Sequence, residues 1–352
     1  MNAYLSRKIS LLSLLAAVMV VYVHAYNLYD AKTQVVSYRN ESVFFLEQLV
    51  SQGLCRVAVP LFFVLSGYLF FQNFSGGISA FYSKIRKRTR TILIPYLLWS
   101  LLGFIAMWIL NTYWLKSTDS PGELSFRDIA DKILIHPVAY QLWFLRDLMI
   151  LVLLSPLLYL LIYFTRWFPF LICTGLWMSR VEPLIIASQA LCFFVLGASI
   201  ALRSETLLLN VLTRRAWLLL IPLWVAVLLF KLVYFQESSE GSPFADVIHK
   251  TAILIGLPAL WIAYDLVTLK RNYINTFLLW IGPGFAFFLF VFHEPTLSLI
   301  KKTAQAAMPD NAVTRLAQYV LAPVIVMLLA MVLSKAMQRY LPLVYRILTG
   351  SR

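Results

Sequence analysis

The sequence predicts an all-α integral membrane protein of about ten transmembrane helices, with both termini in the cytoplasm. Of its 352 residues, 61% are hydrophobic and only 13% are charged, a balance typical of a chain surrounded by lipid. Apolar runs of about 18 residues or more, long enough to span a bilayer, follow one another along nearly the whole chain. The basic residues collect in the connections between these runs, which orients the spans.

Ten apolar runs define the predicted spans, and the fifth of them is short. They cover residues 9–26, 57–74, 91–113, 142–164, 167–180, 183–202, 215–235, 248–268, 275–297 and 316–338. The first run follows Arg7 and Lys8 as a signal peptide would. We interpret it as an uncleaved span because the rest of the chain is equally apolar. The whole of residues 1–352 is expected to form one membrane-embedded domain.

The charges support an even number of spans. With the N-terminus inside, the inner segments hold 17 of the 30 basic residues and Glu205 as their acidic residue. The outer segments hold 10 basic and 12 acidic residues. Gaining or losing one early span would place the basic segment Lys84–Arg90 outside, which is the disfavoured side.

Two outer connections are long. Residues 27–56 contain Ser42–Leu54, an amphipathic segment expected to lie in the membrane interface. Residues 114–141 contain the polar segment Lys116–Glu123 and then a short predicted helix from Ser125 to Ile135.

Composition also excludes some functions. The net charge of +14 does not indicate nucleic-acid binding, because no soluble basic domain is present to host it. The isolated cysteines lack metal-binding spacing and are interpreted as packing residues, so no metal site is expected. They are Cys55, Cys173 and Cys192.

Ionisable residues recur near the outer ends of four predicted spans. An ionisable side chain at the centre of a span costs about 2.5–3.5 kcal/mol on insertion scales, so each one requires a partner or a function. Their shared depth predicts a polar cavity that opens outward. These residues are His24, Arg56, Arg146, Asp147, His293 and Glu294.

Simpler interpretations stay open for single residues. His24 alone would pass for an interfacial histidine, and Arg146 and Asp147 point about 100° apart on a helix. Lys231 is expected to extend its amine to the interface, and Asp265 to cap its helix or face water.

A basic segment precedes the third span. Anchoring to anionic headgroups and capture of a polyanionic cytosolic ligand explain it equally well. Its members are Lys84, Arg86, Lys87, Arg88 and Arg90.

Several of these segments together resemble the membrane acyltransferase-3 family, which includes bacterial O-acetyltransferases of surface polysaccharides. The most specific match is Arg56–Phe71, RVAVPLFFVLSGYLFF. Weaker matches follow the family's order at Val20–Ala25, Pro95–Trp99, Leu142–Leu145 with Ser155–Leu157, and Phe290–Pro295. Where the family often carries Asp and Arg on the first span, this chain has Ser10 and Ser13.

The resemblance implies an acetyl-CoA-dependent O-acetyltransferase of a bacterial cytoplasmic (inner) membrane, acting on an extracytoplasmic glycan or glycolipid. It makes His24 the catalytic histidine. It also places the family's acyl-CoA-binding R-x-x-R element at Lys87 and Arg90, with Arg86 or Arg88 sharing the task. Acetyl-CoA would be a co-substrate, and no bound cofactor is implied.

The chemistry suggests a role for each remaining candidate. His24 would act as general base, Arg56 would stabilise the oxyanion, and Glu294 or Asp147 would orient the imidazole. Substrate binding is assigned to Trp143, Arg146, Asp147 and His293.

The donor is cytosolic and the base lies toward the outside. We therefore expect CoA to dock at Lys84–Arg90 while its pantetheine arm threads the bundle.

The alternatives are a secondary transporter of a small polar solute and a non-enzymatic membrane scaffold. The break at Ile281-Gly282-Pro283-Gly284 favours the transporter, because transporter sites use interrupted helices.

Overall fold

The fold is built entirely of helices in the residues that the structure describes. The computed structural model describes residues 3–26, 41–74, 76–110, 125–183, 185–203, 214–237, 242–268, 281, 284–309 and 311–350. No strand occurs in these ranges, which confirms the all-α prediction for them. The predicted polar segment Lys116–Glu123 and the Gly282-Pro283 part of the predicted break lie outside the described residues.

The first third of the chain forms three long rods. The first is α1 (Ala3–Ala25). The second comprises α2 (Glu41–Glu47), the π-helical η1 (Gln48–Gly53), the 3-10 turn η2 (Leu54–Val57) and α3 (Ala58–Phe71). The third comprises α4 (Ile78–Arg88), the π-helical η3 (Thr89–Leu93) and α5 (Ile94–Leu110).

The second rod corrects the prediction for Ser42–Leu54. This segment does not form a separate interfacial piece, because Val43–Phe71 is one continuous apolar helix of 29 residues. The Ser51 hydroxyl fixes it against the core, with its oxygen 2.5 Å from the Tyr22 carbonyl oxygen and 2.8 Å from the Tyr319 hydroxyl. Packing against α1 and α16 thus holds the segment within the bundle.

The middle of the chain consists of shorter helices. They are α6 (Phe126–Leu134), the 3-10 turn η6 (Tyr140–Leu142), α7 (Trp143–Leu153), α8 (Ser155–Thr165), α9 (Phe168–Met178) and α10 (Ser188–Arg203). The predicted short helix after Ser125 is confirmed, and Ser125 begins it with a capping box.

The predicted span 142–164 is not straight. It bends by 62° between α7 and α8. Pro156, at the start of α8, supplies the reason, since proline has no N–H and its ring clashes with the preceding turn.

The remaining described helices are mostly long. They are α12 (Arg214–Glu237), α13 (Pro243–Thr268), α15 (Phe285–Ala307), α16 (Ala312–Tyr340) and the short α17 (Pro342–Leu348).

The described helices support fewer clear spans than the ten predicted. Five helices in the described residues are long and apolar enough to cross a membrane, or six if the bent α7–α8 pair is one span. Shorter apolar helices cover Phe168–Met178, Ser188–Arg203 and Leu219–Val233. The fold is that of a multi-pass membrane protein, and ten spans with cytoplasmic termini stay predictions.

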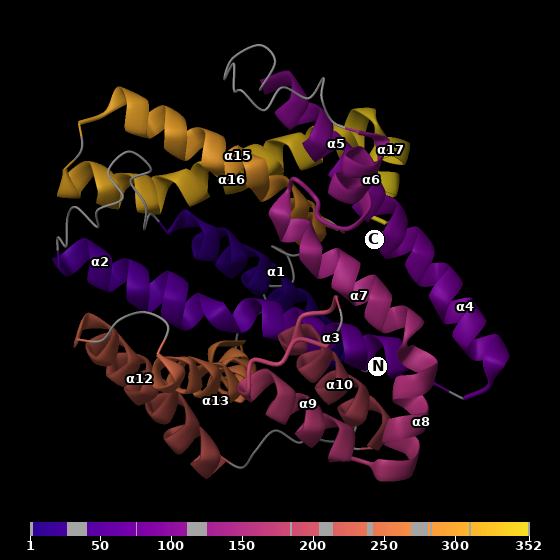
Figure 1. The fold of residues 1–352 in the computed structure, drawn as a ribbon. Helices are drawn as coiled ribbons and strands as arrows, with labels where there is room; N and C mark the ends of the chain where they lie inside the picture. The colour runs from indigo at the N-terminus through magenta and orange to yellow at the C-terminus, as the bar shows by residue number, and fades with distance from the viewer. Residues whose placement is uncertain are drawn as a thin grey trace.

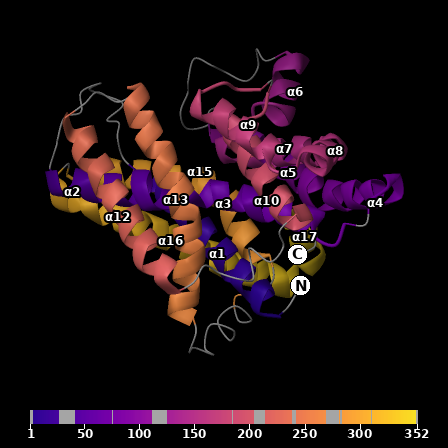
Figure 2. The ribbon, with the colours of Figure 1, turned by 90° about the horizontal axis from the view of Figure 1, so that it is seen from below.

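The α1 helix lies at the centre of the bundle and contacts α3, α15 and α16 (Figure 1). In Figure 1, the α12–α13 pair lies on one side of the α2–α3 rod and the α15–α16 pair on the other. Figure 2 shows α12 and α13 side by side at one edge and the α7–α10 group at the other. α1 is thus positioned to present residues to several helices.

A buried ion pair joins the N-terminal end of α1 to α13. The Lys8 amine lies 2.7 Å from both carboxylate oxygens of Asp265, and the Tyr4 hydroxyl also donates to this carboxylate. Asp265 therefore neither caps its helix into water nor faces solvent as expected. The partner offsets the cost of placing either charge among apolar residues.

Candidate active site

Two histidines from opposite ends of the chain meet near the C-terminal end of α1. Nδ1 of His24 lies 2.8 Å from Nε2 of His293, and the rings stack with centroids 5.0 Å apart. His293 is fully buried and His24 is half-buried. Of the two, His24 is therefore the one accessible to a substrate.

The hydrogen bonds fix the tautomers of both rings. Nδ1 of His293 lies 2.6 Å from the carbonyl oxygen of Phe290, which can only accept, so this nitrogen carries a proton. In a neutral ring Nε2 of His293 then accepts, and Nδ1 of His24 donates to it. This leaves the lone pair on Nε2 of His24, where a general base requires it.

A kink in α15 positions His293. The backbone of Glu294 leaves the helical region at φ −111° and ψ 137°, and Pro295 cannot donate to the carbonyl of Val291. Nε2 of Gln141 donates instead to this oxygen at 3.3 Å and to the Glu294 carbonyl oxygen at 2.8 Å. A single amide thus satisfies two backbone carbonyls at the kink, and a membrane interior requires such internal partners.

Two further side chains hold His24. The ring of Tyr140 meets the imidazole edge-on at 5.1 Å, and its hydroxyl lies 3.5 Å from Oε1 of Glu294. The amine of Lys301 donates to the carbonyls of His24 and Tyr26, at 3.2 and 3.1 Å. Lys301 thereby caps the end of α1 and fixes the backbone that carries the histidine.

Arg56 approaches the same region from the second rod. Its guanidinium donates to Oε1 of Gln52, from Nε at 2.8 Å and also from a terminal nitrogen. The η2 turn that carries it packs against α1. Arg56 is half-buried, and its described contacts with Gln52 use two of its five N–H donors.

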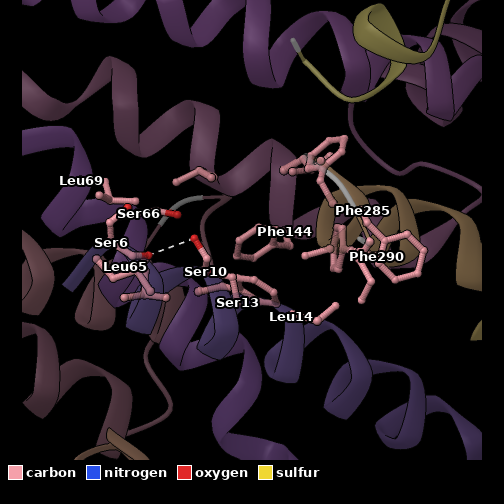
Figure 3. A pocket seen from close by; sticks show the side chains of 18 of the residues that line it. Ser6, Ser10, Ser13, Leu14, Leu65, Ser66, Leu69, Phe144, Phe285 and Phe290 are labelled. Carbon is pink, nitrogen blue, oxygen red and sulfur yellow. Dashed lines mark hydrogen bonds between the residues drawn. The ribbon is translucent and has the colours of Figure 1, made fainter. Parts of the chain in front are cut away.

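A cavity of about 720 Å³ lies along the N-terminal half of α1. Serines cluster toward one end of it and phenylalanines toward the other (Figure 3). Ser6, Ser10 and Ser13 follow one face of α1, because residues three or four apart share a face. Its lining includes the basic residues Arg7 and Arg88.

Three phenylalanines form an aromatic wall of the cavity, and one of them, Phe290, reaches the histidine pair. Phe62, Phe144 and Phe290 all line the cavity and contact one another, with centroids 5.3–6.2 Å apart. The Phe290 ring also lies 6.0 Å from that of His293. The cavity therefore ends one aromatic layer from the histidines.

The fourth predicted span contributes a different arrangement. Arg146 binds Asp147 at 2.8 Å and donates to the carbonyls of Ile135 and Ile185 at 2.6 and 3.4 Å. The buried Asp147 accepts from the Ala187 amide at 2.9 Å. The pair thus binds two connecting segments to α7: the one that follows α6 and the one that precedes α10. The ring of Trp143 contacts that of Phe63, with 6.1 Å between the centroids. None of these described contacts involves His24.

The basic segment divides by environment. Arg88 lines the cavity, while Lys84 donates to the carbonyls of Phe70 and Gln72 at the end of α3. The other three members are exposed and do not line it; they are Arg86, Lys87 and Arg90.

Sequence reasoning missed several residues of the site. Neutral Gln52, Tyr140 and Gln141 carry no signal of their own in an apolar sequence. Lys301 follows the His293-Glu294-Pro295 motif by two helical turns, and this spacing is the one signal that could have identified it. Lys231, expected at the interface, is instead buried and hydrogen-bonds to Gln52 and His249.

Comparisons with known proteins support one family. A family model described as an acyltransferase domain (acyltransferase 3) matches residues 8–335. The succinoglycan biosynthesis protein ExoH of Rhizobium meliloti is 24% identical over 367 residues, covering 100% of this chain and 94% of the relative. No solved structure matches significantly.

Proposed function

Because the chain belongs to the acyltransferase-3 family of membrane acyltransferases, we propose that it transfers an acetyl group from cytosolic acetyl-CoA to a hydroxyl of an extracytoplasmic or lipid-linked glycan. The glycan acceptor is supported by the relative's name, which refers to succinoglycan biosynthesis. The family match favours this activity over the transporter alternative. We place the protein in the bacterial cytoplasmic membrane.

The donor enters from the N-terminal end of α1, which the charge distribution assigns to the cytoplasm. Arg7 and Arg88 line the cavity and suit the phosphates of CoA. The serine face offers hydroxyls to the amides of the pantetheine arm, and the thioester lies deepest. Leu14 is ten residues before His24, or roughly 15 Å along the helix, so the arm has to pass the aromatic wall.

His24 and Arg56 perform the chemistry. Nε2 of His24 removes the proton of the acceptor hydroxyl as its oxygen attacks the thioester carbonyl. Arg56 stabilises the resulting oxyanion. The intermediate collapses by breaking the carbon–sulfur bond, and the imidazolium returns the proton to the CoA thiolate. His293 holds the His24 ring throughout, as the third group of a triad does.

The observation that carries this proposal is that Phe290, which lines the cavity, also contacts His293 of the histidine pair. A passive scaffold would not require a cavity with basic residues at its lining next to a histidine whose ring nitrogen keeps a lone pair.

The test compares two histidine variants. His24→Ala should abolish acetyl transfer from acetyl-CoA to cell-surface glycan, measured as a gain of 42 daltons (the mass of an acetyl group replacing hydrogen) by mass spectrometry. His136→Ala is the control, because that side chain is 70% exposed and binds only Asp131 in the described residues. Activity retained by a folded His24→Ala protein would remove His24 from the mechanism.

A further inference from the structure

An accessible aromatic ring lies directly beside the proposed base. Tyr140 is 50% exposed, yet its ring centroid is only 5.1 Å from that of the His24 imidazole, and the two planes meet at 67°. His293 also contacts His24 but is fully buried. Of the two rings in described contact with His24, Tyr140 is therefore the one that a ligand can also touch.

The backbone next to Tyr140 is fixed to the helix that carries His293. Tyr140 begins the η6 turn, and its neighbour Gln141 is buried. The Gln141 amide donates to the carbonyls of Val291 and Glu294 in α15, at 3.3 and 2.8 Å. A ring on a backbone held in this way loses little freedom when a ligand binds to it, which favours binding.

The surroundings of Tyr140 differ from those of an ordinary interfacial tyrosine. Tyrosines of the aromatic belt sit at the headgroup level, where their hydroxyl groups are wet. The hydroxyl of Tyr140 instead lies 3.5 Å from Oε1 of the buried Glu294, and its ring contacts His24. Both parts of the side chain are thus turned toward the residues of the site.

A half-exposed aromatic ring beside a base suits a sugar. A pyranose presents C–H groups on its faces and hydroxyls around its rim. The face of an aromatic ring carries partial negative charge, so it attracts the slightly positive C–H groups while the hydroxyls stay free. A sugar that covers the accessible part of the Tyr140 ring can therefore direct one rim hydroxyl toward the adjacent imidazole.

From this geometry we propose that Tyr140 binds the acceptor: the C–H face of a pyranose packs against its ring, and one hydroxyl of that sugar reaches Nε2 of His24. This inference rests on the proposed function, because it assumes that the acceptor reacts at His24. It gives Tyr140 a role in acceptor binding that is separate from its contact with the histidine.

The experiment measures acetyl transfer by the full chain in nanodiscs, which leave both faces of the protein accessible. The donor is radiolabelled acetyl-CoA at saturation. The acceptor probe is a glycan extract, including lipid-linked precursors, from cells that lack the gene. Tyr140→Leu removes the ring and should raise the apparent KM for the extract about tenfold, near the upper end for one aromatic contact, with little change in kcat.

Two further variants serve as controls. Tyr140→Phe keeps the ring and loses only a hydroxyl contact that is long for a hydrogen bond, so both kinetic values should stay unchanged. Phe126→Leu removes a ring that is 87% exposed on α6, in the same predicted outer connection, and should also leave KM unchanged. Thermal unfolding confirms that each variant is folded, and Tyr140→Gln decides if Tyr140→Leu is not.

A fall in kcat with KM unchanged in Tyr140→Leu would mean that Tyr140 only holds His24, and it would overturn the inference. Equal losses in Tyr140→Phe and Tyr140→Leu would also overturn it, because the hydroxyl and not the ring would then carry the effect. Absence of transfer by the wild type contradicts the proposed function. Transfer with the same KM in wild type and all variants contradicts only the role of Tyr140.

Discussion

At the scale of single residues, the protein illustrates how a backbone carbonyl can set the chemistry of a distant ring. The carbonyl of Phe290 fixes the proton on Nδ1 of His293, and this determines which nitrogen of His24 keeps its lone pair. The sequence places His24 and His293 at one membrane depth. It does not reveal that they bond to each other, because side-chain direction at the kink depends on the packing of Gln141.

Replacing His293 tests this arrangement. His293→Phe keeps a ring of similar size but removes the acceptor for Nδ1 of His24. We expect kcat to fall by about 100-fold, within the range for general base catalysis, while KM for acetyl-CoA stays unchanged. Single-turnover acetyl transfer with purified protein measures both. A parallel rise in KM would instead indicate that the change disturbs the donor cavity.

Arg88 is the second residue whose replacement tests a single step, here the binding of acetyl-CoA. The basic segment has one member in the cavity lining, which its spacing alone did not single out, because helix phase across the π-helical η3 is not readable from sequence. Arg88→Ala should raise KM for acetyl-CoA about tenfold, equivalent to 1.4 kcal/mol, with little change in kcat. Lys87→Ala, at an exposed position, is the control. An equal effect of both variants would mean that the basic segment attracts CoA by its overall charge and not through a specific contact of Arg88.

At the scale of elements, the Arg56–Phe71 segment combines two tasks on α3. Phe62, Leu65, Ser66 and Leu69 line the cavity because they recur at helical spacing. Gly67 faces the opposite partner and lets α3 touch the backbone of α10 at Phe194, while Gly197 of α10 approaches Val64 in return. Small residues permit this close approach of membrane helices.

The crossing of α3 and α10 predicts a stability effect. In Gly67→Ala, the added methyl would overlap the backbone of Phe194, so we expect unfolding to become easier by about 1–3 kcal/mol, as for other overpacked sites. Gly175→Ala in α9 is the control, since nothing lies within 4 Å of its added methyl. Thermal unfolding midpoints in one detergent compare them. An unchanged unfolding midpoint for Gly67→Ala would mean that α3 and α10 can move apart without a loss of stability.

The elements that sequence reasoning missed share a physical cause. Periodicity located the apolar helices, and the N-cap of α6 at Ser125 was readable from its residues. The continuity of Val43–Phe71 and the bend at Leu154 depend on tertiary contacts and on how a proline is accommodated. Span counting from hydropathy weighs composition, so it cannot distinguish a straight span from a bent or short helix.

At the scale of the whole molecule, the two halves of the proposed reaction lie at opposite ends of α1. The cavity with Arg7 and Arg88 occupies the N-terminal half, and His24 with Arg56 the C-terminal end. The charge distribution in the sequence predicts that the N-terminal end of α1 faces the cytoplasm. The proposal therefore requires that the two ends face different compartments.

Sidedness can be measured with single cysteines. The native Cys55, Cys173 and Cys192 are buried, so the unmodified protein should react little with a membrane-impermeable maleimide. Ser83→Cys, exposed on α4, should be labelled only when the cytoplasmic face is accessible, as in inverted vesicles. Arg127→Cys, exposed on α6, should be labelled from the outside of intact spheroplasts. Labelling of both positions from one side would place the basic segment and α6 in the same compartment. The two ends of α1 would then not face different compartments, and transfer across the membrane along α1 would be excluded even if His24 proved essential.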